Sequence, residues 1–158
     1  EKPIQDILHA LKYQFKAPLG RHFGEVMGKT ILNSNKYKTL EALIPVPIHP
    51  NKLKQRGYNQ SELIAQGLSS ITHLPVLSNV LQLLNPKATQ THKSRFDRWL
   101  NAEKAYSVDV SRFPENISCV ALVDDVVTTG ATAEACIRAI QGVGQVQIVV
   151  LSVCFPLN

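Results

Sequence analysis

The chain has 158 residues, of which 44% are hydrophobic and 18% charged, and its formal net charge is +5. This length and balance predict one compact domain and argue against a disordered chain. No stretch approaches the length of a membrane-spanning helix and no signal peptide is evident. We therefore expect a cytoplasmic protein without membrane insertion.

Apolar residues at helical spacing predict two helices near the start of the chain, over residues 4–15 and from about 23 to 31, the second beginning after Gly20. A short strand is expected at residues 43–46. Its two neighbouring prolines, Pro45 and Pro47, cannot donate to a sheet ladder and predict that the strand ends in a bent loop.

The rest of the chain alternates strand and helix patterns. A helix is expected from about 59 to 71, a strand around 76–84, a polar segment over 85–104, and then elements at 106–108 (strand), 119–123 (strand), 131–140 (helix) and 146–153 (strand). Alternation of this kind predicts an α/β fold that is doubly wound, with a mainly parallel sheet and helices on both of its faces.

Residues 120–132 carry the most informative pattern, because an apolar strand ends there in Asp124 and Asp125 and a small-residue loop then opens a helix. Open α/β sheets bind ligands at the carboxyl ends of their strands, and a helix N-terminus binds phosphate. The predicted phosphate-binding residues are Thr128, Thr129, Gly130, Ala131 and Thr132. Ionised carboxylates accept hydrogen bonds, so the two acids suit the diol of a ribose 5-phosphate unit.

The same thirteen residues resemble the phosphoribosyl pyrophosphate (PRPP) motif of type I phosphoribosyltransferases. Further stretches follow in a fixed order: Ile7-Leu8-His9-Ala10-Leu11-Lys12-Tyr13, Ile44-Pro45-Val46-Pro47-Ile48-His49, Arg56-Gly57-Tyr58-Asn59-Gln60, and Ala88-Thr89-Gln90-Thr91 with Arg98 and Asn101. Together they make nearly all of residues 4–153 resemble the ComF family of competence-associated proteins. The resemblance implies one type I phosphoribosyltransferase-like domain over residues 1–158, without the N-terminal zinc module usual in the family.

The resemblance also implies roles for individual residues. Pro47, Ile48 and His49 correspond to the pyrophosphate loop, and segment 85–104 to the flap that covers the sugar. Asp124 and Asp125 would be the catalytic acids, with Mg²⁺ held through waters and ligand oxygens and no direct metal ligand expected. The basic residues that would meet pyrophosphate or nucleic acid are Arg56, Lys87, Arg95 and Arg98.

The positive charge is concentrated in residues 52–104, which hold eight Lys and Arg against three Asp and Glu. Such a patch suits a polyanionic partner, either pyrophosphate or single-stranded DNA, for which Tyr58, Phe96 and Trp99 offer stacking rings. The resemblance implies a role in natural transformation, in which incoming single-stranded DNA is handled with helicase and recombination-loader partners. The alternative is an active phosphoribosyltransferase, a glycosyltransferase of nucleotide salvage. Both stay open, because no residue stands out as a base for an acceptor.

Overall fold

The computed structural model describes residues 17–84 and 105–155. The helix predicted at residues 4–15 and the polar segment 85–104, with Lys87, Arg95 and Arg98, lie outside the described residues. Within the described ranges, no helix is both long and apolar enough to cross a membrane.

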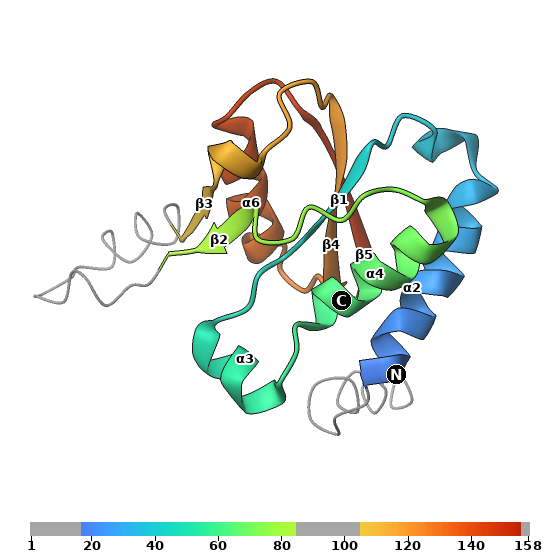
Figure 1. Cartoon of the computed structure of the whole chain (residues 1–158), viewed down its shortest axis with the longest axis horizontal. Coiled ribbons are helices and arrows are strands. Elements are labelled where there is room, and N and C mark those ends of the chain that lie inside the picture. Colours follow the sequence, from blue (N-terminus) through green and yellow to red (C-terminus); the bar gives the residue numbers. More distant parts are fainter. Residues whose placement is uncertain (1–16, 85–104, 156–158) are drawn as a thin grey trace, which may run out of the picture.

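A three-stranded parallel sheet forms the centre of the molecule (Figure 1). Its strands are β1 (Ala42–Pro45), β4 (Cys119–Val126) and β5 (Gln147–Cys154), in the order β1-β4-β5. Helices α2 (Ala17–Leu32) and α4 (Gln60–Thr72) cover one face, and α6 (Ala131–Gln141) covers the other. The predicted α/β class, with a parallel sheet between helices, is confirmed.

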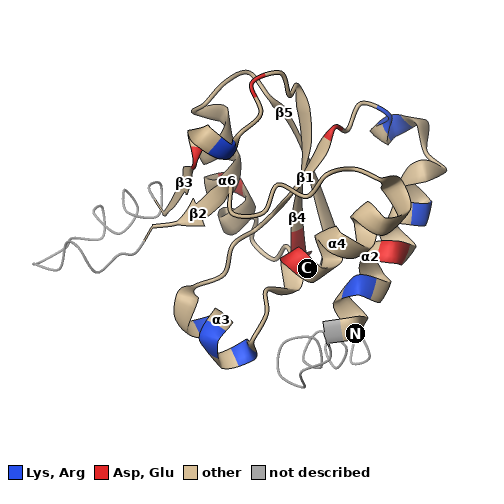
Figure 2. Cartoon of the chain, in the orientation of Figure 1, with Lys and Arg blue, Asp and Glu red and all other residues tan. Residues whose placement is uncertain are grey.

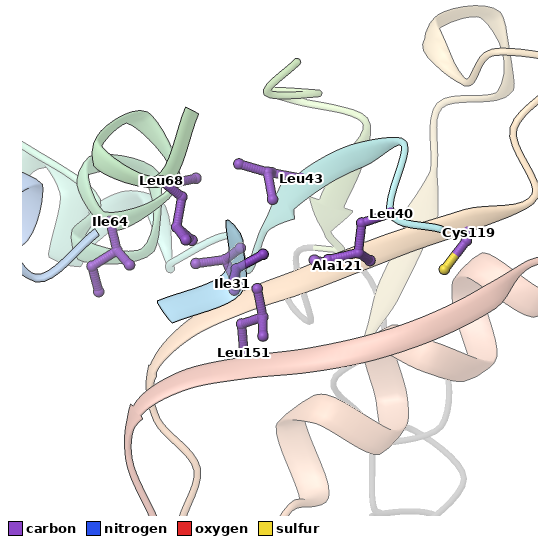
Figure 3. Packing of buried hydrophobic residues seen from close by; sticks show 10 residues of the cluster. Ile31, Leu40, Leu43, Ile64, Leu68, Cys119, Ala121 and Leu151 are labelled. Atoms are coloured by element: carbon purple, nitrogen blue, oxygen red, sulfur yellow. The ribbon is translucent and has the colours of Figure 1, made fainter. Parts of the chain in front are cut away.

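The central strand β4 is buried on both faces, which explains its unbroken apolar run. Ala121 and Val123 pack with Ile64 and Leu68 of α4 in the first core cluster, part of which Figure 3 shows. The intervening side chains of β4 enter the second cluster, with α6 residues such as Cys136 and Ile140. Successive side chains of a strand point to opposite faces, so one short segment joins both halves of the core.

Helices α2 and α4 approach each other closely because glycines line their contact. A Cβ atom added to Gly24 would clash with the Ile64 carbonyl oxygen, and one added to Gly67 would clash with the Arg21 carbonyl oxygen. The prediction that this helix begins after Gly20 is wrong, since α2 starts at Ala17. Pro18 is accommodated because the first turn of a helix does not need its N–H.

The strand predicted around 76–84 is also wrong in part. Leu43 N–H donates to the Pro75 carbonyl and Leu77 N–H donates to the Leu43 carbonyl, so this stretch first touches the free edge of β1. Asn79 then adopts a left-handed φ of 62°. Only β2 (Leu81–Leu83) follows as a strand, and it pairs antiparallel with β3 (Tyr106–Val108) beside α6. A local turn divides what the sequence pattern presents as one run.

Three short helices were not predicted, namely η1 (Asn35–Tyr37), α3 (Pro50–Arg56) and η3 (Val110–Arg112). The most relevant is α3, which follows the Pro47 loop at the carboxyl end of β1. Pro50 occupies its first turn, and Gly57 ends it with a φ of 78°. Because α3 has seven residues, it escapes recognition by periodicity.

Candidate functional site

The two acids of the motif lie inside β4, which runs to Val126 and so extends three residues beyond the predicted strand. Asp124 pairs with Ser152 of β5, and Val126 pairs with Cys154. The longer strand is therefore held by its neighbour in the sheet. Both acids nevertheless stand at its carboxyl end, where the sequence predicts the ligand site.

Asp124 is 8% exposed, and its Oδ1 atom accepts hydrogen bonds from Ser61 Oγ at 3.1 Å and from Asp125 N–H at 2.9 Å. Burial raises the pKa of this carboxyl to about 6, and the adjacent charge of Asp125 adds to the effect. Asp125 is half-buried, and its Oδ1 atom accepts from Val126 N–H at 2.9 Å. The acid pair is thus fixed by backbone amides and by one hydroxyl group from α4.

A small hollow lies between β4 and α6, lined by Asp124 and by residues 126–133. The structure therefore brings all five predicted phosphate-loop residues, 128–132, together with Asp124; Asp125 does not line the hollow. Gly130, with a φ of 78°, is the N-cap of α6 and offers its first-turn amides no side-chain acceptor. The Ala131 amide donates a long hydrogen bond, of 3.4 Å, to Thr129 Oγ1.

Tyr106 of β3 stands next to this loop, and the sequence reasoning missed it. Its hydroxyl interacts with the Thr132 side chain, and burial, followed by the nearby Cys136 and Asp124, raises its pKa to about 12. Burial likewise raises the pKa of the Cys136 thiol to about 12. Both groups are therefore neutral hydrogen-bonding or packing partners of the loop at ordinary pH. The sequence holds no local signal for either contact.

The predicted pyrophosphate-loop residues, Pro47, Ile48 and His49, are half-buried and connect β1 to α3. His49 is the N-cap of α3, since its Nδ1 atom accepts from Asn51 N–H at 3.1 Å. The structure thus gives His49 a capping contact at the place where the resemblance implies a ligand contact.

Hydrogen bonds connect this loop to the acid pair through the start of α4. Asn59 Nδ2 donates to the Val46 carbonyl at 2.9 Å, while Asn59 Oδ1 accepts from Ser61 N–H at 3.1 Å. Ser61 Oγ then donates to Asp124. Sequence reasoning did not single out Ser61, although it directly follows the Arg56–Gln60 stretch that carries the resemblance.

The basic residues are only partly placed. Arg56 ends α3, and its Nη1 atom donates to Gln60 Oε1 at 3.2 Å. Lys52 and Lys54 are exposed on the same helix, which carries no acid (Figure 2). Among the described residues, no three His, Cys, Asp or Glu side chains come together as a metal-binding group.

Comparison with known proteins places this arrangement in context. No protein-family model matches the chain. It is 31% identical over 152 residues to competence protein F of Haemophilus influenzae, covering 93% of the chain and 66% of that protein. It is 25% identical over 158 residues to the DNA utilization protein YhgH of Escherichia coli K12, covering 98% and 68%.

A shorter match joins the chain to competence protein ComFC of Bacillus subtilis, with 31% identity over 98 residues, or 62% of the chain and 37% of that protein. The chain thus spans about two thirds of the length of competence protein F and YhgH. Because the likeness extends over nearly all of its length, the chain belongs to the ComF family, the homologues of competence protein F, ComFC and YhgH.

Proposed function

We propose that this chain is a competence or DNA-utilization protein whose domain has a type I phosphoribosyltransferase-like fold and binds a 5-phosphoribosyl ligand, PRPP with Mg²⁺. The names of its relatives support the first part. The observation that carries the second part is the hollow at the N-terminus of α6, which is bordered by the buried Asp124.

The 5-phosphate occupies the hollow in this proposal. A phosphate dianion is favoured at a helix N-terminus, where amides point at it and the helix dipole is positive. The loop of residues 127–130 offers backbone and hydroxyl donors, and Gly130 brings the backbone close without a side chain. Among the described residues that line the hollow, Asp124 is the one with an acidic or basic side chain.

The ribose diol lies against the acid pair. Asp124 Oδ1 already accepts two hydrogen bonds from the protein, so Oδ2 is the atom that would accept from a ribose hydroxyl. Ser61 and the Asp125 amide act as positioning groups, because they hold the carboxylate plane in one orientation. A fixed acceptor costs less ordering entropy when the ligand binds.

The residues at the site fit Mg²⁺ only in combination with the ligand. Carboxylate oxygens suit this hard cation, which in nucleotide sites is usually held by one or two carboxylates, waters and phosphate oxygens. Asp124 and Asp125 are the side chains that would hold it, through its bound waters. When bound, the ion neutralises phosphate charge.

Helix α3 favours a polyanion as a second ligand. Lys52, Lys54 and Arg56 give it three positive charges on seven residues, and its sequence contains no acid. We propose that it contacts the backbone of single-stranded DNA, in the cytoplasm and beside helicase and loader partners, as the family resemblance implies. Phosphate contacts of this kind need no base recognition.

Thermal unfolding with PRPP and Mg²⁺ tests the proposal. A ligand at one hundred times its Kd stabilises the folded state by about 2.7 kcal/mol, which raises the Tm of a domain of this size by several degrees. The double variant Asp124→Asn with Asp125→Asn is expected to lose this shift, whereas Asp109→Asn, at the half-buried N-cap of η3 and outside the lining of the hollow, should keep it. An unchanged Tm for the native protein would refute PRPP binding.

A further inference from the structure

Gln60, the first residue of α4, has a buried amide that is only half satisfied. The residue is 1% exposed, and its Oε1 atom accepts from Arg56 Nη1 at 3.2 Å. Its Nε2 atom has no hydrogen-bond partner among the described residues. A buried donor without an acceptor lowers stability, so in a native protein such a group calls for an explanation, for example a functional role or a bound water or ion.

The orientation of this amide is not arbitrary. If its oxygen and nitrogen were exchanged, the amide nitrogen would face the Arg56 guanidinium, donor against donor. Arg56 therefore holds the oxygen on its own side and directs the amide N–H groups away from α3. The unsatisfied donor is thus a consequence of the Arg56 contact.

The position of Gln60 in the chain brings it to the candidate site. Asn59, directly before it, binds the Val46 carbonyl at the end of β1, and Ser61, directly after it, binds the Asp124 carboxylate. The neighbouring acid Glu62 is engaged elsewhere, since its Oε1 atom accepts from Ser78 Oγ at 2.6 Å. Gln60 accordingly lies at the carboxyl edge of the sheet, between the predicted pyrophosphate loop and the acid pair.

We propose that Gln60 is a ligand-binding residue whose Nε2 atom donates a hydrogen bond to an oxygen of the bound phosphoribosyl ligand. The inference rests on the proposed function and extends it. Gln60 does not line the hollow formed by residues 126–133, so the oxygen that it binds belongs to a part of the ligand beyond the 5-phosphate. The ligand class is therefore one with a second oxygen-rich group.

Two matched variants on the same helix test this. Gln60→Met keeps the length of the side chain and removes both the unsatisfied donor and the acceptor of Arg56. These two effects on stability oppose each other, so ligand-free stability in urea should change little, while the Kd for Mg²⁺–PRPP in calorimetry should rise about tenfold. Gln66, whose amide contacts both Arg21 and Glu62, provides the control. Gln66→Met should lower stability and leave the Kd unchanged.

The outcomes separate the two proposals. If native protein binds PRPP and Gln60→Met binds it equally well, the ligand contact of Gln60 is refuted while PRPP binding stands. The contact is refuted in the same way if the variant only loses stability. If the native protein does not bind PRPP at all, both proposals fall. A higher Kd with undiminished stability supports the ligand contact, since a purely structural amide would not produce it.

Discussion

The carboxyl group of Asp124 is buried, so its ionisation costs free energy. The residue is 8% exposed and bordered by Asp125, and the Ser61 hydroxyl and the Asp125 amide donate hydrogen bonds to it. Ligand sites commonly retain such groups at the expense of stability. Removing the charge should therefore make the ligand-free protein more stable.

The raised pKa of Asp124 predicts how this gain in stability depends on pH. The pKa of Asp124 rises from its ordinary value of 3.8 to about 6, mainly through burial, so between these values the native state holds a proton that the unfolded chain has lost. Stability contributed by this group is thus lost as pH rises from about 4 to about 6. Asp124→Asn cannot ionise and should exceed native stability by roughly 1–3 kcal/mol at pH 8, and by about half as much at pH 5, midway through this range.

Urea unfolding at the two pH values measures this difference. Asp109→Asn is the control of opposite sign, because the Ser111 hydroxyl, with smaller contributions from the Ser111 amide and Arg112, lowers the pKa of Asp109. That variant should lose stability at pH 8. If Asp124→Asn is less stable than the native protein at pH 8, burial does not govern this carboxyl.

At the scale of elements, the sequence predicts the part of the site whose residues are neighbours in the chain. The β4–loop–α6 unit follows from an apolar run, two acids and helical spacing within 22 residues, 119–140, and the structure contains it with small changes at its ends. The end of β4 was misplaced because its last residues pair with Ser152 and Cys154, which no local pattern reveals.

Contacts between distant segments account for the rest. Ser61 meets Asp124 across 63 positions of sequence, and Tyr106 meets Thr132 from another sheet. The His49 side chain caps the unpredicted α3, a contact that does not bear on its predicted place in the pyrophosphate loop. Periodicity identifies elements, but it does not say which side chains of two elements face each other.

The close approach of α2 and α4 gives an element-level prediction. Gly67→Ala would place a methyl group against the Arg21 backbone and force the helices apart, at a cost of about 1–3 kcal/mol that exceeds the roughly 1 kcal/mol gain in helix propensity. Gly144→Ala is the control, since a Cβ atom there has no neighbour within 4 Å. Equal urea midpoints for the two variants would contradict the close packing.

At the scale of the whole molecule, exposed positive charge occurs at both ends of β1. Lys36 and Lys38 lie at η1, before the strand begins, and Lys52 and Lys54 lie on α3, after it ends (Figure 2). Only the second pair is on the side of the sheet that holds the acid pair and the hollow. If single-stranded DNA is bound next to the ligand site, the lysines of α3 contribute more to DNA binding than the lysines of η1, although each pair carries the same charge.

Two double variants test whether the lysine pairs differ in DNA binding. Lys52→Ala with Lys54→Ala should weaken the binding of a labelled single-stranded oligonucleotide and reduce the slope of log K against log salt by about 1.4, because each lost phosphate contact removes about 0.7. Lys36→Ala with Lys38→Ala has the same net charge and should leave the slope nearly unchanged. Equal losses in the two double variants would mean that DNA responds only to total charge, and α3 would then have no special part in binding it.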